Sequence, residues 1–174
     1  MRSVHLTLCL NRKNSQTCEA NTYFALKMIE LDNNSIFMKA ALAEARIAAS
    51  KGEVPVGAVI TANGRIIARG HNLTEKLTDV TAHAEIQAIT AASNYLGSKY
   101  LQKCTLYVTL EPCPMCAGAL FWSQMGHVVF GASDGKRGYQ KHGGPMHPKT
   151  KITSGIMAEE CAQLLTDFFA HKRN

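Results

Sequence analysis

The order of hydrophobic and polar positions predicts a regular succession of helices and strands after residue 35. Residues 36–50 are rich in Ala, Leu and charged side chains, which favours a helix, and Ser35 stands where its N-cap is expected. Two apolar runs, 56–61 and 65–71, then flank Asn63-Gly64. An Asn-Gly pair between apolar runs is typical of a tight turn, so we expect a β-hairpin here.

The rest of the chain alternates between helical and extended patterns. We expect helices at 81–94, from Pro112 to about 124, and at 157–170, with strands at 104–110, 127–132 and 152–153. A chain that alternates in this way forms a sheet with helices on both faces, and the hairpin makes that sheet partly antiparallel. The predicted fold class is therefore α/β.

One compact domain is expected over 35–174, because the length fits a single domain and no linker divides the chain. Residues 1–34 are then an N-terminal extension outside this domain. Their short apolar stretch lacks the longer core and the cleavage site of a signal peptide. No strong pattern precedes Ser35, which suggests that Met28 is the natural start.

The chain is basic, with a formal net charge of +6. Clustered Lys and Arg neutralise phosphates, so this charge is compatible with a nucleic acid partner. The six cysteines are scattered apart from one Cys-x-x-Cys pair, unlike the dense disulfide framework of small secreted domains, which favours a reducing cytoplasm. No apolar run approaches the roughly 18 residues that span a bilayer, so we expect no membrane partner.

Two short motifs carry the candidate chemistry, His83-Ala84-Glu85 and Pro112-Cys113-Pro114-Met115-Cys116. One imidazole and two thiolates supply three zinc ligands. A structural zinc is usually closed by four protein ligands, whereas a catalytic zinc keeps one position for water. Cys113 and Cys116 are three residues apart near a predicted helix start, where the helix dipole favours thiolates. We therefore predict a catalytic Zn²⁺ held by His83, Cys113 and Cys116.

Glu85 is the candidate proton shuttle beside this metal. A carboxylate whose pKa is raised by a dry pocket can take a proton from an attacking water and return it to the substrate. Taken singly, a His in the core, a structural or redox Cys pair and a solvated Glu are the more common cases. Together, H-x-E and P-C-x-x-C are the signature of zinc-dependent nucleobase deaminases. Cys104 and Cys161 lie in apolar patterns and are predicted core residues.

Beyond these motifs, the stretch from about 37 to 173 resembles the bacterial tRNA-specific adenosine deaminases, of the cytidine and deoxycytidylate deaminase superfamily. The segments that carry the resemblance are Glu53-Val54-Pro55-Val56-Gly57-Ala58-Val59, Thr81-Ala82-His83-Ala84-Glu85, Thr105-Leu106-Tyr107-Val108-Thr109-Leu110-Glu111-Pro112-Cys113, Cys116-Ala117-Gly118-Ala119, Val128-Val129-Phe130-Gly131-Ala132 and Asp167-Phe168-Phe169. The resemblance implies a three-layer α/β/α cytidine-deaminase-like fold with a mixed five-stranded sheet. It also implies a homodimer, Zn²⁺ as cofactor, and conversion of the wobble adenosine of a tRNA anticodon to inosine.

The same resemblance implies two substrate-binding residues. Asn72 matches the position that hydrogen-bonds the target base, and Asp134 matches the position that contacts the sugar of the neighbouring nucleotide. On local sequence alone, Asn72 also fits a turn at a strand end, and Asp134 fits an ordinary Asp-Gly turn. Five basic residues in an acid-free stretch either contact phosphates or belong to a solvated loop: Lys136, Arg137, Lys141, Lys149 and Lys151.

Two alternatives stay open. Pro114-Met115 and Phe121-Trp122 also occur in relatives that deaminate free guanine, so a free nucleobase or nucleoside deaminase is the first alternative. The ending Asp167-Phe168-Phe169 favours tRNA over it. The second alternative is a non-catalytic, zinc-stabilised RNA-binding module. Glu85 argues against such a module, because a structural zinc site needs no carboxylate beside it.

Overall fold

The computed structural model describes residues 15–144 and 146–172. Residue contacts divide the chain into two units, Met1–Asn33 and Asn34–Asn174, and each is described by itself. In the first unit, residues 15–33 are helical and belong to α1 (Ser15–Ser50). The first 14 residues of the predicted extension lie outside the described residues, and the boundary at residue 34 stays a prediction.

The predicted start of the first helix is wrong. Ser35 lies inside α1, which begins at Ser15, so Ser35 does not cap it. The physical reason is local: residues 24–31 are Phe-Ala-Leu-Lys-Met-Ile-Glu-Leu, and no Gly or Pro interrupts the chain between them and residue 36. Good helix formers without a breaker extend a helix past an internal Ser.

The sheet of the second unit has five strands in the order β2-β1-β3-β4-β5. The strands are β1 (Gly57–Ala62), β2 (Arg65–His71), β3 (Cys104–Leu110), β4 (His127–Ala132) and β5 (Lys151–Thr153). β1 pairs antiparallel with β2 and β3, whereas β4 pairs parallel with β3 and β5. The predicted hairpin is confirmed: Asn63 and Gly64 have φ values of 50° and 71°, as a tight hairpin turn requires.

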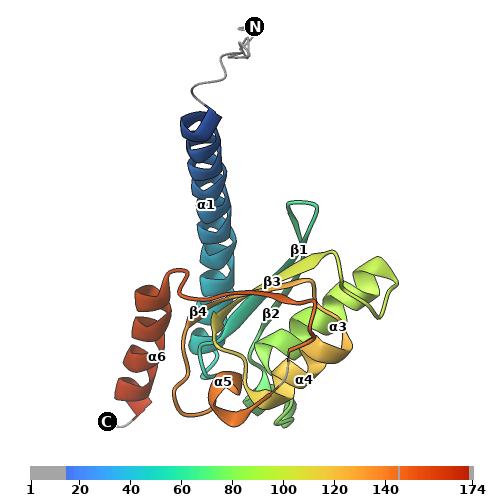
Figure 1. Cartoon of the computed structure of the whole chain (residues 1–174). Coiled ribbons are helices and arrows are strands. Elements are labelled where there is room, and N and C mark those ends of the chain that lie inside the picture. Colours follow the sequence, from blue (N-terminus) through green and yellow to red (C-terminus); the bar gives the residue numbers. More distant parts are fainter. Residues whose placement is uncertain (1–14, 145, 173–174) are drawn as a thin grey trace, which may run out of the picture. The chain divides into compact units, whose positions relative to one another are not determined.

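Helices cover both faces of this sheet (Figure 1), which confirms the predicted three-layer fold class. α3 (Ala84–Leu96) and α4 (Pro114–Trp122) lie on one face, and residues 34–50 of α1 with α6 (Ala158–Lys172) lie on the other. Two further short helices are α2 (Thr74–Leu77) and α5 (Tyr139–His142). α3 and α4 begin a few residues after their predicted starts. The short helices α2 and α5 were not predicted, because four residues are too few to show a helical period.

The strands alternate their side chains between two hydrophobic cores. Ile60, Leu106 and Phe130 face the core shared with α3 and α4. Val59 and Val129 face the opposite core, which residues 34–50 of α1 and α6 cover. Fully burying a side chain of the size of Phe130 contributes about 1.5–3 kcal/mol to the stability of the folded state. Because strand residues are buried in both cores, this packing fixes the positions of the strands and of the segments that follow them. Cys104 and Cys161 are buried, as predicted.

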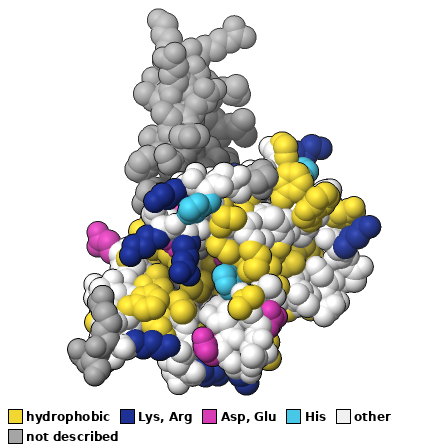
Figure 2. Space-filling view, turned by 90° about the horizontal axis from the view of Figure 1, so that it is seen from below, with side chains coloured by type: hydrophobic (Ala, Val, Ile, Leu, Met, Phe, Trp, Pro, Cys, Tyr) yellow, Lys and Arg dark blue, Asp and Glu magenta, His cyan; other side chains and the backbone are white. Residues whose placement is uncertain are grey.

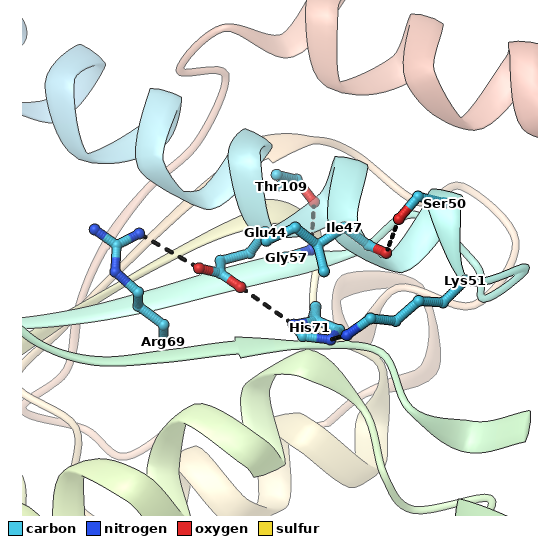
Figure 3. A network of polar contacts seen from close by, with 8 residues as sticks. All are labelled: Glu44, Ile47, Ser50, Lys51, Gly57, Arg69, His71 and Thr109. Carbon is cyan, nitrogen blue, oxygen red and sulfur yellow. Dashed lines mark hydrogen bonds and ion pairs between the residues drawn. The ribbon is translucent and has the colours of Figure 1, made fainter. Parts of the chain in front are cut away.

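A polar network ties the end of α1 to β2 on the outer face (Figure 3). Glu44 accepts from Nδ1 of His71 at 3.1 Å and pairs with Arg69 at 3.4 Å. Lys51 Nζ lies 3.0 Å from Nε2 of His71. Beneath this network Gly57 lets the backbones of β1 and α1 touch, because a Cβ there would collide with the main chain of Ala41. Within the described ranges, no helix is long and apolar enough to cross a membrane.

Candidate active site

His83 stands at the N-cap of α3, with extended φ and ψ of −69° and 157°. The preceding turn holds it there: Asp79 accepts hydrogen bonds from the backbone N–H of Thr81 at 2.8 Å and from its hydroxyl at 2.7 Å. The His83 carbonyl accepts the N–H of Gln87 at 3.1 Å. His83 therefore stands in front of the helix N-terminus, half-buried, with Glu85 in the first turn behind it.

Cys113 stands at the N-cap of α4 in the same way, with φ of −72° and ψ of 168°. Pro114 follows at the first helical position, where its missing N–H costs nothing. Cys116 lies in the first turn and is buried, whereas Cys113 is half-buried. The two helix N-termini thus bring one imidazole and two sulfurs to one place, and their dipoles favour negative charge there.

The three predicted ligand atoms lie within 4.8 Å of one another. Nδ1 of His83 is 3.6 Å from the sulfur of Cys113 and 3.5 Å from that of Cys116. Tetrahedral zinc, with Zn–S of about 2.3 Å and Zn–N of about 2.0 Å, separates its nitrogen and sulfur ligands by about 3.5 Å. The donor set and its spacing therefore fit a metal ion without rearrangement.

The two thiols share one hydrogen bond. The Cys116 thiol donates to Cys113, and this is the main reason why the pKa of Cys113 is lowered to about 4. The same contact, together with burial, raises the pKa of Cys116. A divalent cation binds thiolates rather than thiols, so metal binding at this pair releases the shared proton.

Glu85 is buried, at 3% exposure, next to the three ligand residues. Burial raises the pKa of its carboxyl, although its own backbone N–H and the charge of His83 act in the opposite direction. A raised pKa lets this carboxyl take up and release a proton more readily than an ordinary glutamate, as a proton shuttle must. The contact with Cys116 also lowers the pKa of this carboxyl, which places Glu85 beside the ligands.

Asn72 follows the last residue of β2 and is buried at 5% exposure. Its backbone N–H donates to the carbonyl of Val56 at 3.1 Å, which keeps the chain extended just beyond the strand. Its side-chain nitrogen donates to Thr74 and to Glu53. Glu53 is a residue that the sequence analysis gave no role.

Asp134 lies in the loop after β4 and is half-buried. Its Oδ1 accepts the N–H groups of Lys136 and Arg137, both at 2.9 Å, so the carboxylate caps its own turn. This contact is the local turn considered above as the simpler explanation of Asp134.

Glu111 holds the same loop through hydrogen bonds to its backbone. The sequence analysis gave this residue no role either. Its buried carboxylate accepts the N–H of Asp134 and the N–H of Gln140, both at 3.0 Å. Gly138 packs against it so closely that a Cβ would overlap the carboxylate. Since Glu111 precedes Pro112, it ties the loop of Asp134 directly to the segment that carries Cys113.

A metal-fitting His-Cys-Cys group with a buried glutamate, borne on two helix N-termini of an α/β/α sandwich, defines the class of metal-dependent nucleobase deaminases. Residues 31–173 match the family of MafB19-like deaminases. The chain belongs to this deaminase family, in which it groups with the tRNA-specific adenosine deaminases.

The relatives cover most of the chain. A tRNA-specific adenosine deaminase of Bacillus subtilis is 44% identical over 82% of this chain and 92% of its own length. A structure from work on A-to-I editing by tRNA:A34 deaminases at the wobble position matches with a TM-score of 0.68 and 42% identity, over 74% of this chain and 98% of its own. A guanine deaminase from Nitrosomonas europaea matches with a TM-score of 0.69 at 25% identity, over 78% of this chain and 84% of its own.

Proposed function

We propose that this chain is a zinc-dependent deaminase that converts the wobble adenosine of a tRNA anticodon to inosine. The observation that carries the proposal is the His83-Cys113-Cys116 group with buried Glu85 beside it, in a chain 44% identical to a tRNA-specific adenosine deaminase. Guanine deaminases match less well, at 25% identity for the enzyme from Nitrosomonas europaea and at 38% over 62% of this chain for one from Bacillus subtilis. The free-base alternative therefore has less support than a tRNA substrate, for which the identity is 44% over 82% of the chain. Glu85 argues against a purely structural metal.

In this proposal His83, Cys113 and Cys116 hold Zn²⁺. Zinc, when bound, supplies Lewis-acid activation of water at neutral pH. Glu85 accepts a proton from the attacking water and delivers it to a ring nitrogen of the purine. It then carries the second proton to the amino group, which leaves as ammonia when the C6–N bond breaks and the C6–O bond remains. The raised pKa of its buried carboxyl suits both transfers.

Asn72 is the proposed contact to the target base, and Asp134 to the neighbouring sugar. The target base must leave the stacked loop, which costs least where the RNA is already single-stranded. Lys136, Arg137 and Lys141 are exposed in the loop beyond Asp134 and are available to phosphates. Figure 2 shows basic and His side chains beside hydrophobic ones on the face seen from below. Such a face suits an RNA, which carries negatively charged phosphates and flat nucleobases. We expect the enzyme to meet this substrate in the cytoplasm.

A deamination assay with zinc-loaded protein tests the function directly. An anticodon stem-loop with a wobble adenosine is compared with free guanine, cytosine and adenosine. We expect inosine to form in the stem-loop while the free compounds stay intact. Turnover of a free base with an untouched stem-loop would retain the deaminase chemistry and overturn the tRNA substrate.

The homodimer is proposed to form through the exposed aromatic end of α4. Trp122 is 77% and Tyr100 45% exposed, and the ring of Phe121 packs edge-on against Trp122 at 5.5 Å. An exposed aromatic patch of this kind is typical of an interface. Sedimentation velocity should give a dimer for the unchanged chain and a monomer for Trp122→Glu. A wild-type monomer would refute the proposal.

A further inference from the structure

Glu53 is a buried carboxylate without a cationic partner. Its exposure is 1%, and among the residues whose side chains are described, 33–144 and 146–172, no Lys, Arg or His forms an ion pair with it. Such a group is costly to bury unless hydrogen bonds replace its water shell. The segment that follows β2 supplies them, which makes Glu53 the centre of a polar cluster behind Asn72.

Four donors converge on this carboxylate. The backbone N–H groups of Lys76 and Glu75 donate at 2.9 and 3.2 Å, and the Thr74 hydroxyl donates at 3.2 Å. The fourth donor is the side-chain nitrogen of Asn72, at 3.4 Å. Burial alone would raise the pKa of Glu53, but the hydrogen bonds outweigh it and lower the pKa below its usual value. The group is therefore an ionised acceptor.

An ionised carboxylate only accepts hydrogen bonds, so it determines which end of the Asn72 amide faces it. The nitrogen Nδ2 must point toward Glu53, and it also donates to the Thr74 hydroxyl oxygen at 3.1 Å. Both N–H bonds of the amide are then used inside the protein. Its oxygen, Oδ1, faces away from the cluster. No described residue forms a hydrogen bond with Oδ1, and no buried side-chain oxygen or nitrogen of the described residues lacks a partner. Oδ1 is therefore not enclosed, and it is open to a ligand.

We propose that Glu53 is a positioning residue that orients Asn72 so that its carbonyl oxygen, Oδ1, accepts a hydrogen bond from the bound nucleoside. This inference rests on the proposed function, in which Asn72 contacts the target nucleoside. The donor on the ligand is an N–H group of the target base. Glu53 itself does not touch the substrate and acts only through Asn72.

The same cluster reaches the metal-binding segment. Leu73, next to Asn72, donates its N–H to the carbonyl of Ala82 at 3.0 Å, and Ala82 directly precedes His83. α2 is held at its start by Glu53, through Glu75 and Lys76. Glu53 thus fixes the segment that begins at Asn72. The bond from Leu73 to Ala82 ties this segment to His83, the first of the predicted metal ligands.

A double-mutant cycle with Glu53→Gln and Asn72→Asp tests the pairing. Asn72→Asp places two carboxylates face to face, and we expect kcat/KM for the stem-loop to fall about a hundredfold. Glu53→Gln lets the amide turn, and we expect a fall of about tenfold, mainly through a higher KM. In the double variant the Gln amide can donate to the new carboxylate, whose second oxygen is still presented to the ligand.

The expected result is therefore recovery. The double variant should regain about tenfold in kcat/KM over Asn72→Asp alone, whereas independent effects would multiply to about a thousandfold loss. Zinc content and kcat should stay near wild type in Glu53→Gln, which a merely structural role for Glu53 would not allow. The matched control is Glu44→Gln, a buried carboxylate that bonds to His71, next to Asn72, and we expect it to leave kcat/KM unchanged.

Urea unfolding of the four proteins of the cycle needs no substrate. A midpoint that recovers in the double variant supports the pairing even if the stem-loop proves not to be the substrate, so failure of the proposed function is recognised separately in the wild type. If the midpoints are additive, the pairing is wrong. If they couple but kcat/KM in an active enzyme is additive, the bond exists without orienting Asn72 for the ligand, and the proposal is overturned.

Discussion

Replacing Glu85 with Gln is expected to lower kcat on the anticodon stem-loop by about 10²–10⁴-fold, the usual contribution of a positioned acid–base group. Gln has the same shape as Glu but cannot carry a proton between the attacking water and the purine. The buried position of Glu85, at 3% exposure, excludes bulk water as an efficient substitute. Single-turnover deamination of the stem-loop, with zinc-loaded protein in excess, measures the chemical step directly.

The Glu85→Gln variant should keep its fold and its metal. Burial disfavours the charged form of this carboxyl and raises its pKa, so we expect an uncharged amide of equal size to cost little stability. Zinc per chain and the unfolding midpoint are therefore expected to match the wild type. Glu44 is also buried, at 8% exposure. The variant Glu44→Gln therefore serves as the control for replacing a buried carboxylate by an amide. Unchanged biological activity of Glu85→Gln would favour the non-catalytic RNA-binding module instead.

Side-chain chemistry and short patterns predicted much of the fold. β3 and β4 have the predicted bounds, 104–110 and 127–132, because both are apolar runs between clear turn signals. The hairpin turn at Asn63-Gly64 was equally local. The start of α1 was not, because an N-cap residue such as Ser35 marks a helix start only when the preceding residues cannot themselves be helical.

Some residues of the candidate site could likewise be predicted from the sequence, and others could not. His83, Cys113 and Cys116 are recognisable because few residue types bind zinc, and the structure brings their ligand atoms together. Glu53 and Glu111 could not be assigned, since each accepts backbone N–H groups from a segment about 20–30 residues away, that of α2 for Glu53 and that of α5 for Glu111. The only signal in the sequence was a single acidic residue next to an apolar run, at Glu53 and at Glu111. That signal indicates a buried acceptor but does not name its donors.

Replacing Cys116 with Ala is expected to abolish both zinc binding and deamination. Cys116 is fully buried, and its sulfur lies 3.5 Å from Nδ1 of His83. Ala removes one of three protein ligands and leaves no side chain that could take its place among the described residues of the metal group. Zinc should fall from about one per chain to near zero, because a site that would hold the ion with three protein ligands loses one of them. Metal analysis after dialysis, with the stem-loop assay, measures both effects.

Cys161→Ala provides the matched control, because Cys161 is an equally buried thiol that packs against Gly131 in the opposite core. Its removal costs packing, about 1 kcal/mol for a small truncated side chain, but no ligand. We expect this variant to unfold slightly earlier while retaining zinc and turnover. The two cysteines thus separate a packing defect from the loss of a ligand. If Cys116→Ala kept one tightly bound zinc per chain, the metal would have to be held elsewhere, and the assignment of His83, Cys113 and Cys116 would be wrong.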